Sequence, residues 1–208
     1  MLIAPFLRNR ERANMSSQLR VFGLVPDSIV DGPGLRYGVF VQGCSHGCPG
    51  CHNPESHDPC AGEETTVDAI MEEVAANKLI SGVTLSGGEP FEQAAVCAEI
   101  GERAHELGLN VWTYTGYRYE DLLALASGER DLTEQEALLL YREGVARLLA
   151  TTDVLVDGPF VESMKSLGLQ WRGSSNQRVI DMVTTRKQGS VVLWSQELNL
   201  PEGRPDNW

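Results

Sequence analysis

Residues 37–53, YGVFVQGCSHGCPGCHN, join an apolar segment to a loop that is rich in cysteine. Apolar side chains occupy both alternating sets of positions from 37 to 41, which predicts a strand that is covered on both faces. The strand runs directly into Cys44, Cys48 and Cys51, which are spaced C-x3-C-x2-C. The sequence therefore places three thiols at the C-terminal end of a buried strand.

Strands and helices alternate through the rest of the chain. Further strands are predicted in SGVTLSGGEP (81–90), NVWTYTGY (110–117), DVLVDGPF (153–160) and SVVLW (190–194). Helices are predicted from the pair Thr65 and Asp68 onward, over 94–107 before Gly108, and over 138–149 after the capping-box pair Thr133 and Glu136. This alternation is typical of a parallel α/β sheet or partial barrel.

The predicted strands end in polar or glycine-rich turns. These turns are Gly43 with Cys44, SGGE at 86–89, TGY at 115–117 and DGP at 157–159. Because the C-terminal ends of parallel strands meet at one edge of a sheet, we expect the turns to converge on a single pocket.

Composition excludes several classes of function. A formal net charge of −12 disfavours nucleic-acid binding, which depends on basic surface, and no run approaches the ~20 apolar residues of a membrane span. We expect a loose leader at 1–16, one domain at 17–195 and a loosely ordered tail at 196–208. The leader has its apolar residues before its arginines, the reverse of a secretory signal. Five cysteines, three of them clustered, favour thiol ligands in a reducing cytoplasm over a disulfide scaffold.

The three clustered cysteines are compatible with several kinds of site. A zinc ion needs a fourth ligand, for which His46, His52, His57 and Cys60 are available. A redox-active pair at Cys48 and Cys51 leaves Cys44 without a role. A four-iron cluster held by only three cysteines keeps one iron open for an external ligand, as catalytic metal sites do.

Two motifs together resemble the radical S-adenosylmethionine (SAM) superfamily. They are the C-x3-C-x2-C loop after one strand and SGGEP at 86–90 after the next. The segments DGPGLR (31–36), CPGCHN (48–53), VWTYTGY (111–117), DVLVDGPFVE (153–162) and LQWRGSSNQRVID (169–181) are similar to one branch, the activating enzymes of anaerobic ribonucleotide reductases. The resemblance implies a partial (β/α)6-type barrel of the radical SAM kind with a mostly parallel sheet.

The resemblance also implies roles for individual residues. A [4Fe–4S] cluster is expected on Cys44, Cys48 and Cys51, with SAM on the open iron. The expected SAM-binding residues are Gly50, Cys51, His52, Gly87, Gly88, Glu89, Thr115 and Asp157. The glycines permit close approach of backbone to a ligand, and Glu89 can accept a hydrogen bond from the SAM ammonium group. Cys60 and Cys97 are predicted not to be ligands.

The implied activity is radical transfer to a protein. Reductive cleavage of SAM is expected to produce a glycyl radical on the large subunit of an anaerobic ribonucleotide reductase, with a flavodoxin or ferredoxin-like protein as the electron donor. The alternatives are activation of another glycyl radical enzyme, a radical SAM reaction on a peptide or small molecule, and a zinc-binding structural module.

Overall fold

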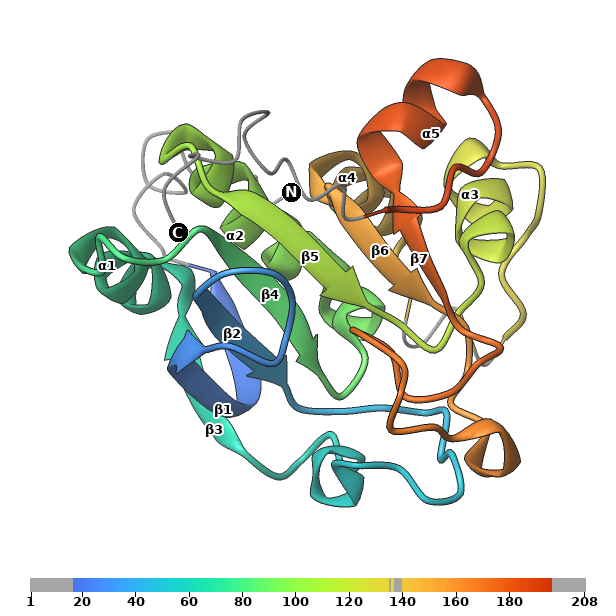
Figure 1. The fold of residues 1–208 in the computed structure, drawn as a ribbon, viewed down its shortest axis with the longest axis horizontal. Helices are drawn as coiled ribbons and strands as arrows, with labels where there is room; N and C mark the ends of the chain where they lie inside the picture. The colour runs from blue at the N-terminus through green and yellow to red at the C-terminus, as the bar shows by residue number, and fades with distance from the viewer. Residues whose placement is uncertain (1–16, 135, 137–139, 196–208) are drawn as a thin grey trace, which may run out of the picture.

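The computed structural model describes residues 17–134, 136 and 140–195, so the predicted leader and tail lie outside the described residues. The fold is built on one seven-stranded sheet with the order β3-β1-β2-β4-β5-β6-β7 (Figure 1). The strands are β1 Gln18–Ser28, β2 Arg36–Val41, β3 Glu63–Thr66, β4 Gly82–Gly87, β5 Asn110–Tyr114, β6 Val154–Asp157 and β7 Arg178–Asp181.

The sheet is parallel at its centre and antiparallel toward its edges. The pairs β2–β4, β4–β5 and β5–β6 are parallel, whereas β1 pairs antiparallel with β2 and β3, and β7 pairs antiparallel with β6. The predicted α/β class is confirmed, and the predicted parallel arrangement applies to the four central strands. Within the described ranges the sheet is open, with β3 and β7 as its edges.

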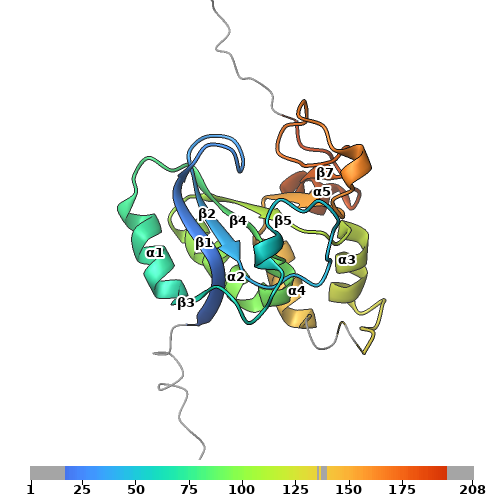
Figure 2. The ribbon, with the colours of Figure 1, turned by 90° about the horizontal axis from the view of Figure 1, so that it is seen from below.

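Helices cover one face of this sheet. They are α1 Val67–Ala76, α2 Ala94–Glu106, α3 Tyr119–Ser127, α4 Arg142–Thr151 and α5 Met182–Gln188, with short 3-10 turns at η2 Pro54–Ser56, η3 Pro90–Gln93 and η5 Glu162–Met164. Figure 2 shows α1, α2 and α4 on the same side of the sheet. Their apolar faces bury alternate strand residues, among them Val39, Leu85 and Leu155, in the main core. Because the strand period is two, the residues in between point to the opposite face.

The opposite face carries a small aromatic cluster. Trp112 of β5 packs against Trp171 and Trp194, with ring centroids 6.1 and 5.1 Å away. Trp171 belongs to the connection before β7, and Trp194 follows α5. Among the described residues, the loops that carry Trp171 and Trp194 thus cover part of this face.

Three predicted element boundaries are wrong. The α1 N-cap is Thr66, whose hydroxyl accepts a hydrogen bond from Ala69 N, whereas Thr65 pairs within β3. The helix expected from 138 begins at Arg142; the hydrogen bonds between Thr133 and Glu136 do form, but they close a separate turn. Residues 137–139 lie outside the described residues.

The third correction concerns the segment 190–194. It contributes one isolated bridge to Ile180 rather than a strand. The final strand is instead β7, which follows the WRGSSNQ segment and pairs antiparallel with β6. The connection over residues 158–177, which carries the 3-10 turn η5 in place of an α-helix, reverses the chain direction, and a pattern of alternating strands and helices does not reveal this.

Candidate functional site

The predicted turns converge on one hollow at the C-terminal ends of β2, β4, β5 and β6. It has a volume of about 130 Å³, and we call it the cysteine hollow. Its lining residues are Cys44, His46, Cys48, Cys51, His57, Ser86, Gly87, Gly88, Glu89, Tyr114, Thr115, Gly116, Gly158, Phe160 and Gln177. Parallel pairing of the central strands brings these distant segments together, as expected for this class of sheet.

The three clustered cysteines are free thiols on the wall of this hollow. Burial raises the pKa of Cys44 to about 12, with the nearby carboxylates adding to the shift. Within the described part of the chain, no group of three His, Cys, Asp or Glu side chains is arranged to hold a single metal ion.

The remaining two cysteines lie elsewhere. Cys60 is exposed and does not line the cysteine hollow, and Cys97 is fully buried within α2 among core residues. That neither is a ligand stays a prediction.

Hydrogen bonds from the backbone shape the cysteine loop. Gly43 N donates to Ser56 O at 2.8 Å, and Cys44 N donates to His57 O at 3.2 Å. The side-chain amide of Gln42 donates to the carbonyl oxygens of Glu55 and Asp58. The segment after the last cysteine is thereby folded back against the end of β2.

Gly87 and Gly88 bring the end of β4 against this loop. Gly87 has φ +95°, and a Cβ at this position would lie 2.6 Å from the Phe40 backbone. A Cβ on Gly88 would lie 2.2 Å from Gly43 O. The chain's own packing therefore excludes a side chain at both positions, in addition to any need for close approach to a ligand.

Glu89 is a buried hydrogen-bond acceptor in the wall of the hollow. Its side chain is only 1% exposed, and its carboxylate accepts from Phe91 N, Thr115 Oγ1, Gly116 N and His46 Nε2 at 2.9–3.0 Å. The carboxylate thus joins the end of β4 to the turn after β5 and to the cysteine loop. The sequence motif alone indicated a ligand contact and did not reveal these internal partners.

His46 is the basic partner of this carboxylate. Burial disfavours the imidazolium form, but the hydrogen bond and charge of Glu89 outweigh it, so the pKa of His46 is raised. The ring also packs edge-on against Tyr117, with centroids 4.5 Å apart. His46 thereby fixes the loop between Cys44 and Cys48.

Asp157 and Gly50 lie outside the cysteine hollow. The Asp157 carboxylate is 1% exposed, forms an ion pair with Arg178 and accepts from Tyr119 N at 2.8 Å. Its neighbour Gly158 lines the hollow in its place. Gly50 has φ +70° and turns the chain between Cys48 and Cys51, with Glu162 packed against it.

A second hollow adjoins the first. This adjoining hollow has a volume of about 370 Å³ and is lined by Val30, Asp31, Phe40, Cys51, His52, Asn53, Ser86, Tyr114, Phe160, Leu169, Trp171, Arg172, Gly173 and Gln177. It shares with the cysteine hollow the residues Cys51, Ser86, Tyr114, Phe160 and Gln177. His52, predicted to bind a cofactor, lies here with its ring 5.4 Å from that of Phe160. Phe160 was not predicted, since it follows a common Gly-Pro turn.

The WRGSSNQ segment, residues 171–177, holds the turn that carries Phe160. Gln177 Nε2 donates to Gly158 O, Asn176 Nδ2 donates to Pro159 O, and Ser174 Oγ accepts from Val161 N. A Cβ on Gly173 would lie 3.0 Å from the Phe160 ring. These contacts make the segment a clamp on the wall shared by the two hollows.

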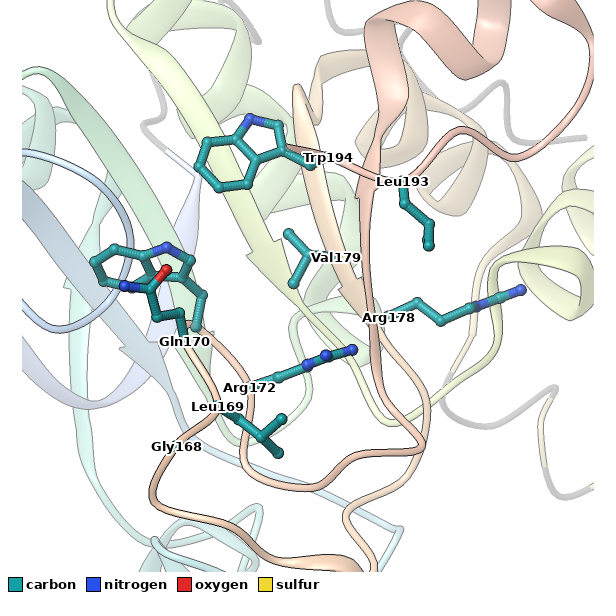
Figure 3. A pocket seen from close by; sticks show the side chains of 9 residues that line it. Gly168, Leu169, Gln170, Arg172, Arg178, Val179, Leu193 and Trp194 are labelled. Atoms are coloured by element: carbon teal, nitrogen blue, oxygen red, sulfur yellow. The ribbon is translucent and has the colours of Figure 1, made fainter. Parts of the chain in front are cut away.

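A third hollow continues along the same face. It has a volume of about 470 Å³ and shares Leu169, Trp171 and Arg172 with the adjoining hollow. Figure 3 shows Trp194, Val179 and Arg172 along its wall. The guanidinium of Arg178 is already paired with Asp157 and Glu120.

Known proteins match this chain over most of its length. The family described as "4Fe-4S single cluster domain" matches residues 30–180. The chain is 33% identical over 169 residues to the anaerobic ribonucleoside-triphosphate reductase-activating protein of Salmonella typhi, covering 77% of this chain and 97% of the relative. Identity to the protein of that name from Escherichia coli K12 is 35% over 164 residues, covering 74% and 93%.

A solved structure, QueE from Escherichia coli, overlaps with a TM-score of 0.38 at 12% identity, over 48% of this chain and 52% of that chain. An overlap this partial carries no functional argument. No helix within the described ranges is long and apolar enough to cross a membrane.

Proposed function

Because the chain belongs to the family of anaerobic ribonucleoside-triphosphate reductase-activating proteins and contains a 4Fe-4S single cluster domain, we propose that it is a radical SAM activase of an anaerobic ribonucleotide reductase. The observation that carries the proposal is the cysteine hollow, where three free thiols face the glycine-rich end of β4. When bound and reduced, the cluster supplies one electron that cleaves SAM to methionine and a 5′-deoxyadenosyl radical, which takes a hydrogen atom from a glycine of the reductase.

Different residues of the cysteine hollow would bind the cluster and SAM. Cys44, Cys48 and Cys51 would hold the cluster, and the position without a fourth cysteine would be left for SAM. Gly87 and Gly88 pack closely against the end of β2 and Gly43, so the end of β4 forms the wall of the hollow where the methionine part would bind. The sheet with its helices then corresponds to part of a (β/α)6-type barrel of the radical SAM kind.

Glu89 and Asp157, both predicted to bind the cofactor, act mainly on the shape of the pocket. Glu89 holds Thr115 and the following turn in place through its internal hydrogen bonds. Asp157, with its ion pair outside the hollow, anchors the strand end rather than contacting SAM. Cys51 and His52 line the adjoining hollow, where the adenosyl group and the glycine of the partner meet.

The partner and the electron donor follow from the reaction. The partner is the large subunit of the reductase, whose glycine enters through the adjoining hollow. A flavodoxin or ferredoxin-like protein supplies the electron. Free thiols of this kind persist in a reducing compartment, so we place the reaction in the cytoplasm.

Anaerobic reconstitution with iron and sulfide tests the proposal. The wild-type chain should bind about four irons and four sulfides. Cys44→Ala should lose the cluster, while the matched control Cys60→Ala should retain it, because Cys60 does not line the hollow. The reduced enzyme should then cleave SAM and produce a glycyl-radical doublet in the reductase by EPR. A single bound zinc without labile sulfide would overturn the proposal.

A further inference from the structure

His57 places a buried nitrogen without a partner beside the cysteine hollow. The residue lines the hollow together with the three clustered cysteines. Its Nε2 atom is buried and has no hydrogen-bond partner within the described part of the chain. Native proteins rarely leave a buried polar nitrogen unpaired, because it loses its hydrogen bonds to water without a replacement. This nitrogen is therefore available for a hydrogen bond with a group that occupies the hollow.

The backbone of His57 is fixed by the fold of the cysteine loop. His57 N donates to Pro54 O and His57 O accepts from Cys44 N, both at 3.2 Å. The residue follows the η2 turn, whose interior hydroxyl, Ser56 Oγ, donates to Asn53 O at 2.7 Å. Both backbone groups are thus committed, and the imidazole is held at the wall of the hollow.

Other donors already occupy the carboxylate in the wall of the hollow. The two oxygens of Glu89 accept from His46, Thr115 and two backbone N–H groups. The same wall carries sulfur, because Cys44, Cys48 and Cys51 present free thiols there. A thiolate or a sulfide accepts a hydrogen bond from an imidazole N–H.

We propose that His57 Nε2–H donates a hydrogen bond to a sulfur of the cluster or of its cysteine ligands and thereby raises the reduction potential of the cluster. This inference rests on the proposed function. Addition of an electron makes the sulfur atoms more negative, so a donor stabilises the reduced form more than the oxidised form. His57 is a positioning residue here, since it acts on the cluster environment and not on SAM or on the glycine of the partner.

The charges near the cysteine loop make such a donor useful. The Glu89 carboxylate lines the hollow, and the Glu92 carboxylate accepts hydrogen bonds from Ser45 N and Ser45 Oγ, next to Cys44. The same negative charges oppose the arrival of an electron in the hollow. A hydrogen bond donated by His57 partly offsets this effect, and His57 does not become a ligand of the cluster.

An anaerobic redox titration followed by EPR of the reduced cluster tests the proposal. His57→Phe should lower the ratio of reduced to oxidised cluster about tenfold at a fixed solution potential, or ~59 mV for one electron. His57→Gln retains a side-chain N–H and should restore much of the ratio. His105→Phe is the matched control, because His105 pairs with Asp153 at the surface and does not line the hollow.

Iron and sulfide analysis of every sample separates the possible failures. A wild-type chain that binds no cluster contradicts the proposed function, whereas equal potentials in wild type and His57→Phe overturn the role of His57. Wild-type protein labelled with ¹⁵N-histidine provides a measurement that needs no variant. We expect an ¹⁵N coupling to the reduced cluster in pulsed EPR, and its absence would also overturn the role.

Discussion

Replacement of Glu89 by glutamine should destabilise the protein strongly while changing its shape very little. The carboxylate is 1% exposed, and one oxygen accepts from Phe91 N while the other accepts from Gly116 N and His46 Nε2. An amide presents one oxygen and one NH₂ group. Whichever way it turns, the NH₂ group faces a backbone N–H that donated to the carboxylate, so one buried donor loses its partner.

The expected cost follows from these contacts. An unsatisfied buried N–H costs ~1–3 kcal/mol, and loss of the charge-assisted bond to His46 adds ~1 kcal/mol. The free energy of unfolding should therefore fall by ~2–4 kcal/mol. With a urea m-value of ~2 kcal/mol/M, the unfolding midpoint should move down by ~1–2 M.

Equilibrium urea unfolding followed by tryptophan fluorescence measures this shift. The matched control is Glu92→Gln, because Glu92 accepts from Ser45 N and Ser45 Oγ at an exposed position. The control should change the free energy of unfolding by no more than ~1 kcal/mol, since water replaces the lost contacts. If Glu89→Gln unfolds within 0.5 M of the wild type, as estimated from the same m-value, Glu89 does not organise the strand ends as described.

Three further variants address the backbone, a surface ion pair and a helix cap. Gly87→Ala should lower the free energy of unfolding by roughly 2–5 kcal/mol, because the added Cβ meets the β2 backbone. Gly108→Ala is the control and should lower it by ~1 kcal/mol, because the space around Gly108 is open. Equal losses in thermal unfolding would contradict this reasoning. The hydrogen bond from Arg178 lowers the pKa of Glu120 from 4.5 to about 2. The stability that Glu120 contributes is therefore present above pH 4.5 and lost as the pH falls toward 2. The contribution to the free energy of unfolding is at most ~1 kcal/mol, because the pair is half exposed. Glu120→Gln should remove this part of the pH dependence of unfolding. Thr66→Ala should destabilise by ~1 kcal/mol by removing the α1 N-cap, and a change below 0.3 kcal/mol would argue against the cap.

Local patterns predicted the central fold well. The strand before the cysteine loop, the strand before SGGEP and the helix α2 all lie where periodicity and glycine positions indicated. Each has a strong local signal, either a short apolar run or a regular apolar face ended by glycine. The antiparallel edges were missed, because pairing direction depends on how a connection crosses the sheet rather than on the strand's own residues.

The candidate site was likewise predicted from the sequence only in part. Cysteine spacing alone left a zinc ion, a redox-active pair and a cluster open, and the cluster with its cofactor pocket was predicted from the resemblance of two sequence motifs to a family. Only the tertiary structure decided which side chains remain free to act there. Asp157 is engaged by Arg178, 21 residues away, and Glu89 by Thr115, 26 residues away, whereas His57 retains an unpaired nitrogen. The physical reason is that a buried polar atom without a partner is costly, so most find one, and the partner comes from whichever distant strand the sheet brings alongside.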